Sequence, residues 1–88
     1  MTVGIVGLGL IGGSMAKAYH EAGHTVWGLD QNQVTQEFAA LSGCIDGALT
    51  EEKISTCDLI LLAAYPAGSE AWLQEMAPRL AGRTVIDC

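Results

Sequence analysis

Four glycines lie close together near the start of the chain, in the stretch GLGLIGGS at residues 7–14. Gly7, Gly9 and Gly12 fit the pattern G-x-G-x-x-G, which binds the pyrophosphate of a dinucleotide when it links a strand to a helix. The first glycine permits a tight turn, the second lets the pyrophosphate approach the backbone, and the third lets the helix lie close on the strand. Backbone N–H groups at the helix start can then meet the phosphates. The alternative is a close helix–strand contact that holds no ligand. The loop residues predicted to bind the cofactor are Gly7, Leu8, Gly9, Leu10, Ile11 and Gly12.

An acidic residue follows at the distance that a dinucleotide site requires. Asp30 ends a predicted strand 18 residues after Gly12, near the offset of about 20 expected for the acid that binds the adenosine ribose. One carboxylate there can accept hydrogen bonds from both ribose hydroxyls, although Asp30 could instead cap the following helix. No Lys or Arg lies between Lys17 and Lys53, so the turn at Gln31 offers no cation for the 2′-phosphate of NADP. The sequence therefore favours NAD as the cofactor.

A third group of candidate residues lies at the end of the fourth predicted strand. Ligands of open parallel sheets bind beyond the carboxyl ends of the strands. The small residue Ala64 lets the middle of the cofactor pass, and Tyr65, before Pro66, is placed to flank a ring. The alternative is that these residues only complete a buried strand. At the matching end of the fifth strand stand Asp87 and Cys88, and Cys88 has no neighbour in the sequence that would activate it as a nucleophile.

The apolar pattern places these candidates at the ends of alternating strands and helices. Strands are predicted at residues 2–7, 25–30, 44–47, 58–65 and 83–87, and helices at 10–22, 33–42 and 69–80, with a short helical turn capped by Thr50. Alternation with short links indicates a parallel sheet covered by helices. The expected fold is α/β, a Rossmann-type parallel sheet with helices on both faces, truncated after the fifth strand. The apolar positions at helical spacing are Ile11, Met15, Ala18 and Ala22 in the first helix, and Val34, Phe38 and Leu41 in the second.

The composition argues against several other classes of function. Ten acidic residues face four scattered basic ones, which argues against binding to nucleic acid and to anionic membranes. No apolar run reaches the roughly 20 residues that cross a bilayer, and no basic region precedes the first apolar stretch. The three cysteines form no C-x-x-C pair, so we expect reduced thiols in a cytoplasmic protein without a metal site. His20 and His24 are interpreted as solvated surface groups near a helix end at Gly23.

Several longer stretches carry a resemblance to a known family. GIVGLGLIGGSMAKAY followed by EAGHTVWGLD resembles the start of the prephenate and arogenate dehydrogenases of tyrosine biosynthesis. The doublet Gly12–Gly13 before Ser14 is more distinctive than the bare glycine pattern. DLILLAAYP resembles the family's fourth strand, and RTVIDC resembles the strand before its D-x-x-S-x-K loop. The resemblance implies an NAD(P)-binding domain, here residues 1–88, joined to a helical, dimer-forming domain that this chain lacks. It also implies oxidative decarboxylation of prephenate or arogenate.

The resemblance assigns roles to only some of the residues. Gly7, Gly9, Gly12 and Asp30 match the family's dinucleotide-binding positions, residues 64–66 stand where the family has a segment beside the nicotinamide, and Asp87 matches the loop's Asp. The family's catalytic residues would all follow Cys88. The chain is therefore expected to be an inactive NAD-binding fragment of a homodimeric enzyme that acts on a small molecule. The alternatives are the cofactor domain of another NAD-linked reductase, of the β-hydroxyacid dehydrogenase or imine/pyrroline reductase type, and a noncatalytic nucleotide-sensing module.

Overall fold

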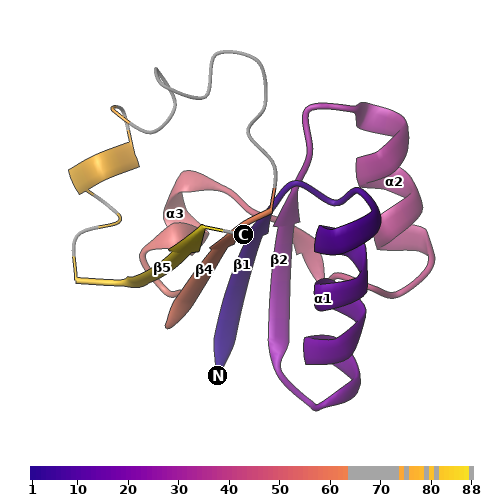
Figure 1. Cartoon of the computed structure of the whole chain (residues 1–88), viewed down its shortest axis with the longest axis horizontal. Coiled ribbons are helices and arrows are strands. Elements are labelled where there is room, and N and C mark those ends of the chain that lie inside the picture. Colours follow the sequence, from indigo (N-terminus) through magenta and orange to yellow (C-terminus); the bar gives the residue numbers. More distant parts are fainter. Residues whose placement is uncertain (64–73, 75, 79, 81, 88) are drawn as a thin grey trace.

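Parallel strands form one sheet in the order β3-β2-β1-β4-β5 (Figure 1). The structure is a computed structural model that describes residues 1–63, 74, 76–78, 80 and 82–87. Helices α1 and α2 cover one face of the sheet, and α3 lies on the other face (Figure 1). This strand order and layering confirm the predicted Rossmann-type fold. The described elements are β1 (Thr2–Val6), α1 (Leu10–Glu21), β2 (Thr25–Leu29), α2 (Gln33–Leu41), β3 (Gly47–Ala48), α3 (Glu51–Ile54), β4 (Leu59–Leu62) and β5 (Thr84–Asp87).

Strand β1 is the centre of the sheet, and its side chains divide the core into two halves. β1 pairs with β2 on one side and with β4 on the other. Val3 and Ile5 face the α1 and α2 side with Ala16 of α1, whereas Val6 faces the α3 side with Ile54. Strand β4 is buried along its whole length, as expected from an unbroken apolar run in a sheet covered on both faces.

The helix α1 rests on the sheet through a different face from the one predicted. Gly12 and Ala16 are its buried residues, whereas Ile11 is 63% exposed and Ala18 and Ala22 are also exposed. Of the predicted residues only Met15 packs against the core, and it is partly buried. The glycine loop brings the helix so close to β1 that only very small residues fit between them. Burial therefore follows size here rather than hydrophobicity.

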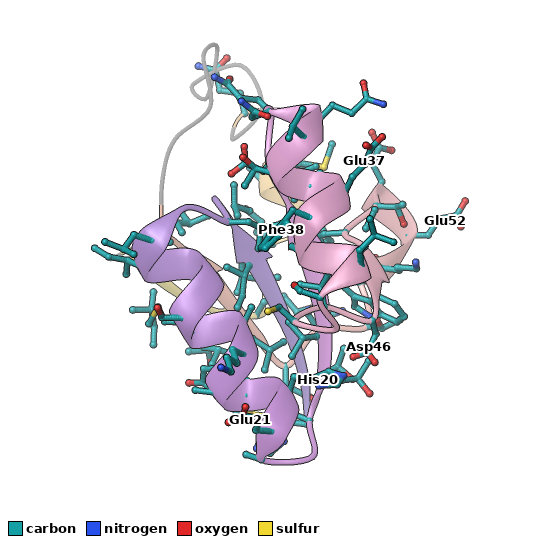
Figure 2. The ribbon with its side chains drawn as sticks, turned by 90° about the vertical axis from the view of Figure 1, so that its right-hand side faces the viewer. His20, Glu21, Glu37, Phe38, Asp46 and Glu52 are labelled. Carbon is teal, nitrogen blue, oxygen red and sulfur yellow. The ribbon has the colours of Figure 1, made fainter. Side chains whose placement is uncertain are left out.

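The helix α2 shows the same discrepancy. Its predicted inward residues Val34, Phe38 and Leu41 are exposed, Phe38 by 71% and Leu41 by 88%, and Ala39 is buried in their place. Phe38 lines a groove between α1 and α2 (Figure 2). The side chain of Gln36 hydrogen-bonds to β2, and with Ala39 it defines the face that α2 presents to the sheet.

Most element boundaries agree with the prediction to within one residue, but those of β3 and the carboxyl end of β4 do not. The third strand was expected at residues 44–47 and lies at Gly47–Ala48. The backbone N–H of Val26, which a longer β3 could have met, donates instead to the Asp46 carboxylate at 2.7 Å. Thr50 caps α3 as predicted, its hydroxyl accepting from the N–H of Lys53. The strand expected at 58–65 is β4, Leu59–Leu62, and Ala63 already lies beyond its end. Residues 64 and 65, and most of the helix expected at 69–80, lie outside the described residues.

The exposed position of Phe38 leads to a stability prediction. We expect Phe38→Gln to change the free energy of unfolding by no more than about 0.5 kcal/mol, as is usual for surface substitutions. Ile60→Ala, at a position with no exposed area, should cost about 2–5 kcal/mol because it leaves a cavity in the core. Urea denaturation of both variants measures the difference. Similar losses of unfolding free energy in the two variants would show that Phe38 is buried rather than exposed.

Candidate dinucleotide-binding site

The carboxyl ends of three neighbouring strands meet at one edge of the sheet. The glycine loop follows β1, Asp30 follows β2, and Ala63 follows β4. The chain crosses from β3 at one side of the sheet to β4 at the other, so the neighbours β1 and β4 flank the point where strand order reverses. The backbone N–H of Ala63 donates to the carbonyl of Val6 at 2.8 Å, which holds these two strand ends together.

Two glycines of the loop are required by the fold itself. Gly7 has a φ of 93°, in the region that side chains disfavour. A Cβ atom on Gly12 would lie 1.7 Å from the carbonyl oxygen of Gly7, a distance that no packing adjustment accommodates. The alternative of a tight helix–strand contact therefore explains Gly7 and Gly12 without any ligand.

Gly9 differs from these two glycines, because nothing in the described structure requires it. Its φ of −69° suits any residue, and a Cβ atom there would have no heavy atom within 4 Å. Gly9 borders a hollow of about 280 Å³. A ligand that approaches the backbone is the physical reason for a glycine at such a position. The hollow is lined by Gly7, Gly9, Leu10, Ile11, Gly12 and Ala63.

The start of α1 offers positive partial charge at the same place. Gly9 is the N-cap residue and supplies no side-chain oxygen to the N–H groups of the first turn, and no acidic residue lies in that turn. Such a helix start favours an anion, because its N–H groups and the helix dipole point toward it. Leu8 is buried in the core, so only its backbone can face a ligand, whereas Leu10 and Ile11 are exposed beside the hollow.

Asp30 connects the glycine loop to the turn after β2. One carboxylate oxygen accepts from the N–H of Leu8 at 2.8 Å and the other from the N–H of Asn32 at 2.8 Å. A carboxylate has about four acceptor positions, so each oxygen keeps capacity for a further donor. The helix-cap alternative does not describe Asp30, because the N-cap of α2 is Asn32, whose side chain accepts from Thr35. Gln31 is exposed next to it.

The remaining predicted residues are placed as follows. Ala64, Tyr65, Pro66 and Cys88 lie outside the described residues. Asp87 ends β5 in register with Leu62 of β4, at the same edge of the sheet as the glycine loop. Lys17 lines the neighbouring groove of about 290 Å³ between α1 and α2, together with Thr35 and Phe38. The predictions did not include Gln36, whose contacts with β2 depend on how α2 returns over the sheet.

The histidines lie at the far end of α1 from the glycine loop. His20 Nε2 is 3.2 Å from Asp46 Oδ1 (Figure 2), with 39% of its side chain exposed. His24 Nδ1 lies 2.9 Å from the terminal amino group of Met1, and its ring packs against Tyr19. Both are thus partly exposed side chains at the surface, and each lies beside a polar group. Within residues 1–63 and the described part of 74–87, no group of three or more His, Cys, Asp or Glu side chains could hold a metal ion.

The described cysteines Cys44 and Cys57 are free thiols. Burial raises the pKa of the Cys57 thiol, an effect that the positive charge of Arg83 opposes and the Asp58 carboxylate increases. A thiol with a raised pKa stays protonated and is a poor nucleophile. Cys57 is therefore a core residue, donating to the carbonyl of Lys53 at 3.3 Å. None of the helices in the described part of the chain is both long and apolar enough to cross a membrane.

Comparison with known proteins shows which family this chain matches. The family model described as "NADP oxidoreductase coenzyme F420-dependent" matches residues 2–88. Among solved structures, arogenate dehydrogenase from Synechocystis is 32% identical with a TM-score of 0.81, over 99% of this chain and 32% of that chain. Prephenate dehydrogenase from A. aeolicus, solved with hydroxyphenyl propionate and NAD+, is 29% identical with a TM-score of 0.71, over 99% of this chain and 32% of that one.

A reductase of another type is also similar. An imine reductase from Streptomyces aurantiacus is 25% identical with a TM-score of 0.79, over 99% of this chain and 31% of that chain. No curated protein matches the sequence. The chain thus spans about a third of the length of the structures it matches. The predicted resemblance to prephenate and arogenate dehydrogenases is confirmed, and the same fold also occurs in imine reductases.

Proposed function

Because this chain belongs to the family described as NADP oxidoreductase, coenzyme F420-dependent, we propose that it binds NAD as the cofactor-binding part of a prephenate or arogenate dehydrogenase. The family and the fold establish a Rossmann domain of the nicotinamide dinucleotide-dependent oxidoreductases. The observation that carries the proposal is Gly9, a glycine that borders the hollow and has open space where a side chain would be. A pyrophosphate in that space would explain it.

Different residues at this edge of the sheet suit different parts of a dinucleotide. The N–H groups at the start of α1 would bind the pyrophosphate, and the free acceptor positions of Asp30 would bind the ribose hydroxyls. Ala63 closes the hollow on the β4 side. When bound, the nicotinamide would accept a hydride from the substrate as carbon dioxide leaves and the substrate ring becomes aromatic. Residues 64–66 are proposed to lie beside the nicotinamide.

The substrate chemistry is proposed to depend on residues outside this chain. In the structures it matches, about two thirds of the length lies outside the matched region. We place there the catalytic groups, the helical domain and the dimer contacts of a cytoplasmic parent enzyme. By itself the chain should bind the cofactor without turning over prephenate. NADH formation by the purified chain in the presence of prephenate, above that of a blank, would contradict this assignment.

Cofactor choice tests the proposal on the chain itself. The Asp30 carboxylate should repel the 2′-phosphate of NADP, so calorimetry should give NAD a dissociation constant at least about tenfold lower, or about 1.4 kcal/mol. Gln31→Arg should narrow this difference by pairing with the phosphate, whereas Gln33→Arg on the first turn of α2 serves as the control for added charge. Equal affinities for NAD and NADP in the unmodified chain would contradict the proposed preference for NAD. The second candidate is an imine reductase-type domain, which the 25% identity supports.

A further inference from the structure

The side chain of Gln36 joins two backbone groups at the end of β2. Its Nε2 donates to the carbonyl of Gly28 at 2.8 Å, and its Oε1 accepts from the backbone N–H of Asp30 at 2.7 Å. Both bonds are partly buried. A single amide thus holds β2 at two points that are two residues apart, and the second point is the residue whose carboxylate faces the glycine loop.

At Asp30 the contact with Gln36 replaces a neighbouring strand, whereas the carbonyl of Gly28 also accepts from the backbone N–H of Leu49 at 2.8 Å. Strand β3 pairs only with Trp27 and Gly28, so it does not reach the N–H of Asp30. On the opposite edge of β2, the carbonyl of Leu29 accepts from the N–H of Gly7 at 2.7 Å. Gln36 supplies the missing partner on the β3 side, because residues two apart in a strand present their backbone groups to the same edge.

Asp30 is consequently held at three atoms. Its backbone N–H is held by Gln36, and its two carboxylate oxygens are held by the N–H groups of Leu8 and Asn32. The carboxylate bonds set the orientation of the group, and the Gln36 bond sets where the backbone carrying it lies. Binding groups act well only when their own positions are fixed by such supporting contacts.

We infer that Gln36 is a positioning residue for Asp30, and that it sets the affinity for the ribose of the dinucleotide without contacting that ribose. This inference rests on the proposed function, in which Asp30 binds the ribose hydroxyls. A purely structural role, the docking of α2 on the sheet, would predict a loss of stability from the removal of Gln36 and no coupling to Asp30. The two roles therefore differ in a measurable way.

A double-mutant cycle with Asp30→Ala separates these roles. Gln36→Met keeps the length of the side chain and removes both hydrogen bonds. By calorimetry, we expect Gln36→Met to raise the dissociation constant for NAD about three- to tenfold, the usual effect of one neutral hydrogen bond. In the Asp30→Ala background, the same substitution should change it less than about twofold, because the positioned group is gone. Gln33→Met is the matched control and should leave the dissociation constant unchanged, because the side chain of Gln33 donates to the exposed Glu37 at 3.1 Å.

The outcomes show whether the proposed role of Asp30 fails or only the inference about Gln36 fails. If Asp30→Ala leaves NAD affinity unchanged, the role of Asp30 is wrong and the inference is overturned with it. If Asp30→Ala weakens binding, but Gln36→Met has the same effect in both backgrounds or none in either, only the inference is overturned. Thermal unfolding of each variant confirms that it is folded at the assay temperature. Should Gln36→Met unfold, Gln36→Asn, whose shorter neutral amide no longer reaches the N–H of Asp30, completes the same cycle with the same expectation.

Discussion

Asp30→Ala is expected to weaken NAD binding at least about a hundredfold and also to lower the stability of the protein. Hydrogen bonds to a charged group contribute about 1.5–3 kcal/mol each, and about 1.4 kcal/mol corresponds to a tenfold change in affinity. The loss of two ribose bonds should therefore cost at least about 3 kcal/mol, which corresponds to slightly more than about a hundredfold. The substitution also removes the acceptor for the N–H of buried Leu8, which should cost about 1–3 kcal/mol of unfolding free energy. Calorimetry measures the first effect and urea denaturation the second.

Asp46 provides a matched control for this substitution. Its carboxylate also accepts a backbone N–H, that of Val26 at 2.7 Å, but it lies beside His20 at the opposite end of α1 (Figure 2). Asp46→Ala should therefore reduce stability by an amount comparable to Asp30→Ala and leave the NAD dissociation constant unchanged. Equal weakening of NAD binding by the two variants would mean that Asp30 acts only through the stability of the fold.

The sequence predicts the order of the elements better than the way the helices pack. The apolar run of β4 and the alternation of strands with helices leave few arrangements other than a parallel sheet. The predicted buried faces of α1 and α2 are wrong, because an argument from helical periodicity assumes that large apolar residues are buried. Here the helices approach the sheet through Gly12, Ala16 and Ala39, and the large residues are displaced to the exposed side.

The sequence also predicts some residues of the candidate site and misses others. The spacing of Gly7, Gly9, Gly12 and Asp30 is a local pattern that can be read from the sequence, and the structure brings them to one edge of the sheet. Nothing in the sequence marks Gln36, since its bonds to Gly28 and Asp30 arise only when α2 packs back over β2. The third strand was misplaced because it pairs through only two residues, too few for a periodic signal.

Alanine is expected to have different effects at Gly9 and Gly12: a loss of NAD affinity at Gly9 and a loss of stability at Gly12. Gly9→Ala should change the free energy of unfolding by less than about 1 kcal/mol, because the cost of alanine at an N-cap is offset by the reduced freedom of the unfolded chain. It should still raise the NAD dissociation constant at least about tenfold, since the new methyl group enters the space proposed for the pyrophosphate. Gly12→Ala should instead cost about 3 kcal/mol or more, because its Cβ would meet the Gly7 carbonyl at 1.7 Å.

The comparison of these variants tests whether the glycine loop exists for a ligand or for the packing of α1. Gly23→Ala provides a reference for strain alone, because Gly23 has a φ of 91° with open space around it and lies at the far end of α1. It should lower the melting temperature and leave the NAD dissociation constant of the folded protein unchanged. A Gly9→Ala variant that keeps both its stability and its NAD affinity would remove the main support for the proposed function. If Gly9→Ala loses NAD affinity with its stability intact, the absent side chain serves a bound molecule, because no contact within the described fold depends on it.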